Sequence, residues 1–395
     1  MEIIDKIKQS AQSLRQELSD IRRHLHMNPE LSLKEHKTAA FIASKLDEYN
    51  IRYEKGIAVT GLVGYIEGKN PGSRTIALRA DMDALPINEE NDVEYKSITP
   101  GVMHACGHDL HMTCLLGAAK ILQQFRDELT GTVKLIFQPS EETFPGGASM
   151  MIKEGVLENP KPSAIFGQHV LPELEAGKIG LKAGQYMAST DEIYLTVHGK
   201  GGHGATPDLN IDTVVIASHI IIALQQIVSR NATPTIPSVL SFGSVKAEGR
   251  TNIIPNEVKI AGTFRTFNEK WRADAHEKIT RLAKGIAESM GGSCDVFIDK
   301  GYPFLVNDAD VTLNTREAAV RYLGAENVVD LEQRMTAEDF AYYSQLVPAC
   351  FYRLGVRNES KGIIHNLHTS RFDADEKSLE TGAGLMAYLA VNALK

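Results

Sequence analysis

The sequence predicts an α/β protein with a mostly parallel central sheet covered by helices on both faces, and with a smaller α+β domain inserted in the chain. Two patterns support this fold class. Between Thr60 and Leu181, short apolar runs bounded by Gly or Pro alternate with segments of helical periodicity, which is typical of parallel strands joined by helices. After residues 182–188 the order changes to β-α-β-β-α-β, which indicates a small domain with an antiparallel sheet. A chain of 395 residues is long enough to hold both domains.

The first domain begins with two expected helices. One runs to about Leu25 and ends before the proline of "MNPELS", and the other covers 34–49. Strands are expected at "TGLVGYIEG" and "TIALRADMDALP", because each contains a short apolar run bounded by Gly or Pro. Next come a helix at "TCLLGAAKILQQFRDEL", a strand at "GTVKLIFQPSEE", a helix near "GGASMMIKEGVLE" and a strand at "AIFGQHV". Polar residues that follow these strands should meet at the carboxyl edge of the sheet, where active sites of such folds gather.

The inserted domain is expected over 185–300, and the flanking segments 1–184 and 301–395 are expected to form the first domain. Its strands and helices are placed at 190–202, 211–230, 238–249, 257–267, 269–290 and 293–299. The run "VVIASHIIIALQQIV" is interrupted by Ser, His and two Gln, and we interpret it as a buried helix. The chain closes with an amphipathic helix at "EKSLETGAGLMAYLAVNAL".

Composition narrows the range of functions. Hydrophobic residues make up 43% of the chain and charged residues 23%, as in ordinary soluble enzymes. The net charge is −8 and no run of Lys and Arg is long enough to follow a phosphate backbone, which argues against nucleic acid as a partner. We find neither a secretory signal nor an apolar run of about 18 residues, so no membrane partner is expected. The four cysteines form no tight framework, which favours a reducing, cytoplasmic location.

One stretch, "GVMHACGHDLHM", crowds potential metal ligands together, and further polar residues follow the expected strands. These residues are Asp81, Asp83, Cys106, His108, Asp109, Glu141, Glu142 and His169. Thiolate, imidazole and carboxylate are ligands for first-row transition metals, and a carboxylate beside a metal-bound water can take its proton. Each residue alone is more often a core or surface residue, and no regular spacing such as HExxH occurs. The residues by themselves therefore leave a metal site and a polar loop about equally open.

Several motifs, and the order in which they occur, resemble those of a known family. These motifs are "RADMDALP", "GVMHACGHDLHM", "FQPSEE", "GQHV", "GKGGHGATPDLNID", "TNIIPNEV", "GTFRT" and "TAEDFAYY". Together they are similar to those of the metal-dependent amidohydrolases that include hippurate hydrolases, N-acyl-amino-acid amidohydrolases and indole-acetyl-amino-acid hydrolases. This family lies within the larger group of aminoacylases and co-catalytic dipeptidases. The resemblance extends from "RRHLHMNPELS" to the final helix, and so covers nearly the whole chain.

The resemblance implies a centre of two divalent metal ions, whether Mn, Zn, Co or Ni. Cys106 would bridge the ions, with Glu142 and His368 completing one site and His108 and His169 the other. Glu141 would act as the general base, and Asp83 would lie behind the ions. In "IIHNLHTSRFD" the family pattern favours His368 over His365. Asp81 stands where aminoacylases have a histidine ligand and is left out of the ligand set; Asp109 and His111 are expected to orient the ligands, and His104 has no assigned role.

For the inserted domain, the resemblance implies a lid and dimerisation domain that contributes to the site. His203 would reach into the active site of a partner subunit and polarise the scissile carbonyl, which requires a homodimer or a higher homo-oligomer. Asn252 and Arg265 would hold the substrate carboxylate, which suits arginine because its planar fork can form two parallel hydrogen bonds. A phosphate-binding loop at "HGKGGHGATP" is the alternative, but Pro207 and the absence of a GxxxxGK[ST] pattern argue against it.

The expected activity is hydrolysis of the amide bond of an N-acyl amino acid, such as an N-acetyl or benzoyl derivative, to a carboxylic acid and a free amino acid. A metal-activated water would attack the acyl carbon, with Glu141 accepting its proton. A dipeptidase or aminopeptidase with the same dinuclear centre is the nearest alternative. A non-catalytic metal-binding protein is another, but the paired Glu141 and Glu142 argue against it.

Overall fold

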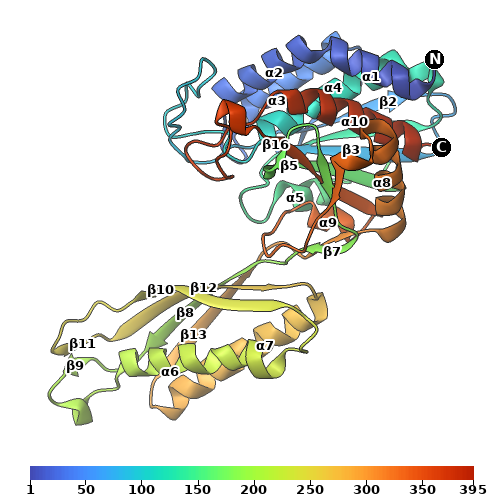
Figure 1. Cartoon of the computed structure of the whole chain (residues 1–395). Coiled ribbons are helices and arrows are strands. Elements are labelled where there is room, and N and C mark those ends of the chain that lie inside the picture. Colours follow the sequence, from blue (N-terminus) through green and yellow to red (C-terminus); the bar gives the residue numbers. More distant parts are fainter. The chain divides into compact units, whose positions relative to one another are not determined.

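A computed structural model describes all 395 residues, and the chain forms two compact units, each described here by itself (Figure 1). The first unit comprises Met1–Tyr186, Val306–Gln333 and Asp339–Lys395. The second comprises Met187–Leu305 and the short segment Arg334–Glu338. The sequence had placed the return of the chain to the first domain at 301 and had not separated 334–338 from it. That segment carries no pattern of its own, and only its pairing, such as that of Arg334 with Met187, assigns it to the second unit.

The first unit is built on an eight-stranded sheet of order β1-β2-β4-β3-β5-β16-β6-β15. Its centre, β4-β3-β5-β16, is parallel, whereas β1, β2 and β6 pair antiparallel with β2, β4 and β16. This confirms the predicted mostly parallel α/β sheet. The strands are β1 (Arg52–Ile57), β2 (Gly61–Glu67), β3 (Thr75–Asp81), β4 (Thr132–Gln138), β5 (Ala164–Glu175), β6 (Ile179–Leu181), β15 (Val328–Asp330) and β16 (Ala349–Arg357). The edge strand β1 was not predicted, because its sequence RYEKGI is mostly exposed and lacks an apolar run.

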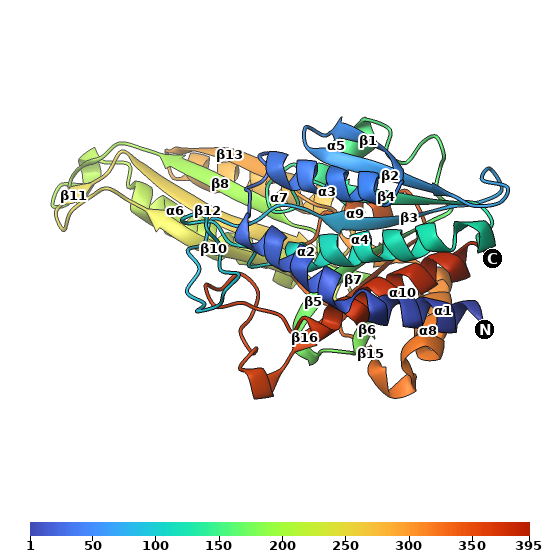
Figure 2. The same ribbon diagram turned by 90° about the horizontal axis from the view of Figure 1, so that it is seen from above.

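Helices cover both faces of this sheet, as predicted. On one face α2, α4 and α10 lie side by side, as Figure 2 shows, and together with α1, α3 and α8 they enclose the larger core. On the other face, near Phe351 of β16, lie the short helices α5 and α9 (Figure 1). The helices are α1 (Ile3–Ser13), α2 (Arg15–Met27), α3 (His36–Glu48), α4 (His108–Gln124), α5 (Gly147–Lys153), α8 (Ala309–Leu323), α9 (Ala341–Ser344) and α10 (Lys377–Ala393). The single helix expected before Leu25 is two helices, α1 and α2, which meet at Leu14.

The second unit has the predicted β-α-β-β-α-β order. Its four-stranded sheet, β10-β12-β8-β13, is antiparallel throughout, and α6 and α7 pack on one face of it around Leu195, Ile220 and Ile279. Its main elements are β8 (Asp191–His198), α6 (Thr213–Gln226), β10 (Ser238–Lys246), β12 (Glu257–Thr266), α7 (Glu269–Ser289) and β13 (Ser293–Lys300). A further pair of short strands in this unit is β9 (Gly202–His203) with β11 (Ile253–Ile254). The strands β7 (Gly184–Met187) and β14 (Leu305–Asn307) also pair with each other, and most of their residues belong to the first unit.

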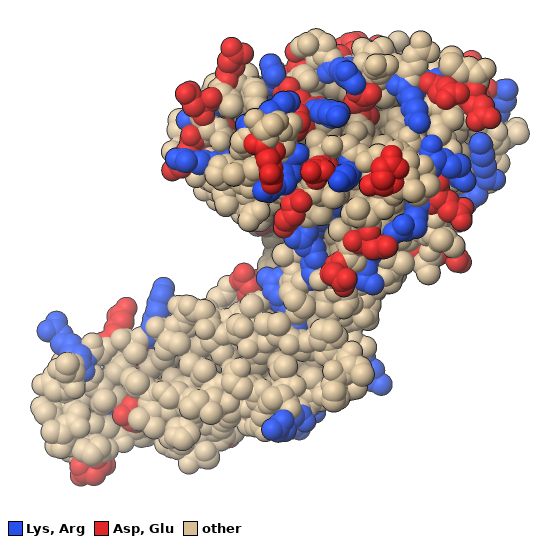
Figure 3. Space-filling view, viewed as in Figure 1, with Lys and Arg blue, Asp and Glu red and all other residues tan.

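The prediction that α6 is buried is wrong for one of its faces. Ile216, Ile220 and Leu224 face the core of the second unit, whereas Ile222 is 71% exposed and Val215 43%. Figure 3 shows few Lys, Arg, Asp or Glu side chains over the drawn face of this unit. By length and composition alone, Thr213–Asn231 is long and apolar enough to cross a membrane. One such helix is only weak evidence of a membrane span. The sequence misled because an apolar run shows that a helix has nonpolar faces but not what covers them.

Candidate metal centre

The start of α4 places Cys106 and His108 at the carboxyl edge of the sheet. The helix begins at His108, earlier than the expected start at Thr113, so the motif forms its first turn. Gly107 precedes it in the left-handed conformation, with φ of 84°. A Cβ atom at Gly107 would lie 2.4 Å from Val170 Cγ2, so a larger residue would collide with the middle of β5. Glycine therefore allows the motif to approach the strand that carries His169.

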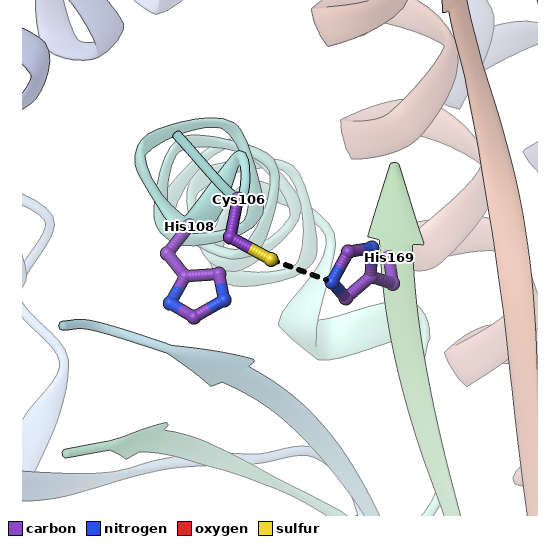
Figure 4. Close-up of side chains that lie close together, drawn as sticks. All are labelled: Cys106, His108 and His169. Carbon is purple, nitrogen blue, oxygen red and sulfur yellow. Dashed lines mark hydrogen bonds between the residues drawn. The ribbon is translucent and has the colours of Figure 1, made fainter. Parts of the chain in front are cut away.

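Cys106 lies at the junction of two groups of potential metal donors. Its Sγ is 3.4 Å from His169 Nε2 and 3.3 Å from His368 Nε2 (Figure 4 draws the side of His108 and His169). One group comprises Cys106, His108 and His169, and the other comprises Cys106, Glu142 and His368. Within each group the donor atoms lie within 4.8 Å of one another. The five residues that the sequence singled out as ligands are thus brought together, with the thiol shared between the two groups.

The histidine rings are oriented with one nitrogen toward the sulfur. His108 Nδ1–H donates to the Asp83 carbonyl at 2.8 Å, and His169 Nδ1–H donates to the Val170 carbonyl at 2.9 Å. These bonds occupy Nδ1 and leave Nε2 of each ring facing the cluster, which is the nitrogen that would bind a metal ion.

Two buried atoms of the cluster lack any hydrogen bond, namely His108 Nε2 and Glu142 Oε1. They lie 3.9 Å apart. Burying polar atoms without partners is costly, whereas a cation bound in each donor group would satisfy both atoms. The donor set therefore fits divalent metal ions.

The charges around Cys106 also favour the binding of cations. Burial raises the pKa of the Cys106 thiol well above its usual value, and the carboxylates of Glu142, Glu141 and Asp81 raise it further. For His108, burial lowers the pKa, but Asp81 and Asp83 outweigh it and raise the pKa to about 10. So many acidic groups around one thiol form a negative environment that favours bound cations.

A bend after β4 lets Glu141 and Glu142 share one site. The strand ends at Gln138 rather than continuing to Glu142, and Ser140 adopts a left-handed conformation with φ of 52°. Asp83 holds this turn, since its Oδ1 and Oδ2 accept the N–H groups of Glu141 and Glu142, each at 3.0 Å. Asp83 thus lies behind the donor cluster and fixes the backbone that carries both glutamates.

Glu141 is buried and is held by a network that sequence reasoning missed. Its Oε1 accepts the Asp339 N–H at 3.3 Å. The Asp339 carboxylate accepts from Arg79 Nη2 at 2.7 Å and from Gln138 Nε2. A buried arginine within an apolar strand, as in "TIALRAD", was the one signal in the sequence that such a network exists.

Asp81 and His111 belong to the same network. Arg79 Nη1 and His111 Nδ1 each donate to Asp81 at 2.6 Å, and the Val170 N–H donates to His111 Nε2 at 2.9 Å. Burial raises the pKa of Asp81, but the charges of His108 and Arg79 and the hydrogen bond from His111 outweigh it and lower the pKa well below its usual value. His111 therefore links Asp81, at the end of β3, to the backbone of β5 beside His169.

Asp109 occupies a different place from the one expected for ligand support, and His104, which had no assigned role, lies outside the donor groups. Asp109 accepts from Arg22 Nε at 2.9 Å and from His26 Nδ1 at 2.8 Å, so it anchors α4 to α2 and does not contact the ligand rings through a hydrogen bond. His104 is buried, and neither of its ring nitrogens has a hydrogen-bond partner. His365 is exposed and belongs to no donor group, whereas His368 adopts φ of 59° and donates its N–H to the Ala105 carbonyl at 2.8 Å.

The remaining candidates lie in the second unit. His203 ends β9, opposite Ile253 of β11, and the Gly204 N–H donates to the Asn252 carbonyl at 2.9 Å, so His203 and Asn252 lie close together on one exposed pair of short strands. Arg265 lies on β12, and its Nη1 donates to the Met335 carbonyl at 3.1 Å. Burial lowers the pKa of Arg265. No carboxylate forms a hydrogen bond with this guanidinium.

Comparisons with known proteins cover nearly the whole chain. A model of "Peptidase family M20/M25/M40" matches residues 77–392. The N-acyl-L-amino acid amidohydrolase of Geobacillus stearothermophilus is 42% identical over 303 residues, which is 77% of this chain and 81% of that protein. Thermostable carboxypeptidase 2 of Saccharolobus solfataricus is 39% identical over 395 residues, covering 99% of each chain. The crystal structure of Bacillus subtilis YXEP, described as a dinuclear metal binding peptidase from the M20 family, superposes with a TM-score of 0.83 at 36% identity, over 97% of this chain and 99% of that one.

Proposed function

The chain belongs to the peptidase family M20/M25/M40, and on that premise we propose that it hydrolyses the amide bond of N-acyl amino acids to a carboxylic acid and a free amino acid. Membership confirms the resemblance found in the motifs and makes the protein a metal-dependent hydrolase of amide bonds. The observation that carries the proposal is the pair of donor groups sharing Cys106, beside which Glu141 is held by Asp339 N–H.

In this proposal the chain holds two divalent ions, whether Mn, Zn, Co or Ni. Cys106, which both donor groups share, would hold both ions, with Glu142 and His368 serving one ion and His108 and His169 the other. A bound pair of this kind supplies Lewis-acid activation of water and of the scissile carbonyl. The Nδ1–H bonds of His108 and His169 to backbone carbonyls support the assignment, since they direct Nε2 of each ring toward the cluster.

Glu141 serves as the general base in this scheme. It takes the proton of the attacking water and returns it to the leaving nitrogen of the amino acid. Its support is its burial, its place beside Glu142 on the turn held by Asp83, and the hydrogen bond from Asp339 N–H that orients its carboxylate. Asp83 acts only by holding that turn and His108.

Recognition of the substrate is assigned to the second unit. Asn252 and Arg265 hold the substrate carboxylate, and His203 of a partner subunit polarises the scissile carbonyl, so the working enzyme is at least a homodimer. The exposed apolar residues Val214, Val215 and Ile222 of α6 support an interface between copies on this unit. We further propose a cytoplasmic location, for which the support is that all four cysteines are unpaired.

A peptidase with the same centre is the second candidate, favoured by the relative named thermostable carboxypeptidase 2 at 39% identity. The two candidates differ in the group on the acyl side of the scissile bond. A dipeptide presents a free ammonium group there and an N-acyl amino acid does not, so a peptidase must accommodate a positive charge that an acyl-specific enzyme need not.

Release of free amino acid from N-acetyl amino acids, benzoyl amino acids and dipeptides, each assayed with Mn²⁺, Zn²⁺, Co²⁺ and Ni²⁺, tests the proposal. We expect kcat/KM to be at least about tenfold higher for N-acyl substrates than for dipeptides of the same amino acid. The reason is that the dipeptide would bury its ammonium group without a partner. Dipeptides as the better substrates with every metal would favour the peptidase instead.

A further inference from the structure

A short arm of the chain between α2 and α3, residues 30–35 with sequence ELSLKE, contacts the turn that carries the two glutamates. The Ala84 N–H donates to the Glu30 carbonyl at 2.8 Å, which places the arm beside the strand end that carries Asp83. Ser32 Oγ donates to Asp83 Oδ2 at 2.6 Å. The arm precedes the region matched by the family model, which begins at residue 77.

Glu35, the last residue of the arm, has no exposed surface. Its Oε1 accepts the Ser140 N–H at 2.9 Å, and its Oε2 accepts from Thr60 Oγ1 at 2.7 Å. Neither partner is charged. Burial of a carboxylate with only neutral donors is costly, so its place here calls for a role that offsets that cost.

Glu35 and Asp83 together fix three successive N–H groups. The N–H of Ser140 donates to Glu35, and those of Glu141 and Glu142 donate to the two oxygens of Asp83. Ser140 has φ of 52°, a conformation that L-residues avoid. The N–H of Ser140 would be buried without a partner if Glu35 were absent, so Glu35 stabilises the strained residue from which the turn departs.

This turn decides where the glutamate side chains point. Glu141 reaches the Asp339 N–H, and Glu142 Oε1 lies 3.4 Å from His368 Nε2. If Ser140 returned to an extended conformation, the side chains of Glu141 and Glu142 would point to opposite sides, as successive residues of a strand do.

We propose that Glu35 is a positioning residue for the general base, acting through the Ser140 N–H to hold the 140–142 turn in its productive conformation. The inference rests on the proposed function for the role of Glu141, but the hydrogen bond from the Ser140 N–H to Glu35 does not depend on that function. Glu35 forms no hydrogen bond with the donor cluster or with a proposed substrate-binding residue, and its one hydrogen bond to the turn is that from the Ser140 N–H.

The variant Glu35→Ala should lower kcat about 10- to 100-fold, since a small displacement of a catalytic group has effects of this order. KM should stay within about threefold, because Arg265 and Asn252 are unchanged. Glu35→Gln should retain most of the wild-type kcat, because its amide oxygen can accept from Ser140 while its amide nitrogen donates to Thr60. Glu35→Asp keeps the charge but is one methylene shorter, so it should lower kcat as much as Glu35→Ala does. It replaces Glu35→Ala in this test if the alanine variant does not fold.

Hydrogen exchange of the backbone amides of residues 140–142 in the metal-free protein gives a readout that does not depend on activity. Exchange should be at least about tenfold faster in Glu35→Ala than in the wild type, because one of three adjacent N–H groups has lost its acceptor. The matched control is Glu30→Ala, from the same arm. Glu30 Oε2 accepts the Thr38 N–H at 2.9 Å and makes no hydrogen bond to the turn, so this variant should leave kcat and the exchange of 140–142 unchanged.

Wild-type kcat and wild-type exchange in both Glu35→Ala and Glu35→Asp would overturn the inference. Equal acceleration of exchange in Glu30→Ala would also overturn it, since the effect would then belong to the arm as a whole. Fast exchange in Glu35→Ala, together with a wild-type protein that hydrolyses no N-acyl amino acid, would support the hold on the turn and would contradict the proposed function instead.

Discussion

Cys106 is the residue on which both donor groups depend. Its sulfur lies within 3.4 Å of His169 Nε2 and is equally close to His368, residues far apart in the sequence. Burial and surrounding carboxylates raise the pKa of the thiol well above its usual value. Without a metal the thiol is therefore protonated, and only a bound cation would stabilise it as the thiolate that can bridge two ions.

Replacing Cys106 with serine tests that role. We expect Cys106→Ser to lower the affinity for divalent ions at least about tenfold, because a neutral hydroxyl is a much weaker bridging ligand than a thiolate. Titration calorimetry with Co²⁺ or Zn²⁺ measures the change. Cys114→Ser is the matched control, since Cys114 is also buried on α4 but belongs to no donor group; equal losses in both variants would contradict the bridging role.

Glu141 gives the second prediction at this scale. Glu141→Gln should lower kcat by about 10²- to 10⁴-fold, the range typical of a lost general base, with metal content unchanged. Steady-state kinetics with metal analysis measures both quantities. Glu90→Gln, at an exposed glutamate that pairs with Arg371, should keep wild-type activity. More than a few per cent of wild-type turnover in metal-loaded Glu141→Gln would show that another group takes the proton.

The sequence allowed these residues to be named because the motifs contain them, but it could not reveal what holds them. Arg79 and Asp339, which are joined by a 2.7 Å hydrogen bond, are 260 positions apart. Glu35 is one of several glutamates in a charged segment, and nothing in the pattern indicates that it is buried against Ser140. Partners of this kind depend on tertiary contacts that local periodicity does not encode.

At the scale of elements, helix α4 and Gly107, which precedes it, determine where Cys106 and His108 lie. The sequence predicted a helix only from Thr113, because the residues from His108 to Met112 lack the apolar pattern of a surface helix, and it left a polar loop or a metal site open for the residues before it. The helix begins at His108 since its first turn is buried and its polar groups pair with Asp81, Asp83, Arg22 and His26. Hydrophobic periodicity cannot predict the start of a helix whose buried face is polar.

The variant Gly107→Ala tests this placement. Its Cβ would lie 2.4 Å from Val170 Cγ2, and the residue would keep a positive φ. We expect a loss of about 2 to 5 kcal/mol in the free energy of unfolding, from left-handed strain plus overpacking, together with weaker metal binding. Gly101→Ala, at a φ of 74° with open space around it, should cost only the strain of about 1 to 2 kcal/mol. Urea unfolding of both metal-free variants measures the difference, and equal losses would mean that the contact with Val170 is unimportant.

At the scale of the whole molecule, the order of the elements was the most predictable feature. The parallel centre of the first sheet and the β-α-β-β-α-β order of the second unit follow from apolar runs and helical periodicity, which are local properties. The edge strand β1 and the segment Arg334–Glu338 were missed because neither carries an apolar pattern. The exposed face of α6 was also missed, because its sequence resembles that of a core helix.

The proposed action of His203 across subunits gives a prediction at this scale. His203→Ala and Glu141→Gln should each be nearly inactive. When the two are mixed and their subunits exchange, a heterodimer unites the intact Glu141 of one chain with the intact His203 of the other. Random exchange in a symmetric dimer should then restore about a quarter of wild-type activity. Differently tagged chains verify the exchange, and no recovery after verified exchange would remove the role of His203 in the partner's site.

The central claim, a dinuclear centre that hydrolyses N-acyl amino acids, is tested most directly by titrating metal-stripped protein with Mn²⁺ or Zn²⁺ while following release of the free amino acid. Activity should be absent without metal, and it should rise until two ions are bound per chain, as measured by metal analysis of the same samples. Full hydrolysis by protein free of metal, or saturation of activity at one ion per chain, would contradict the account.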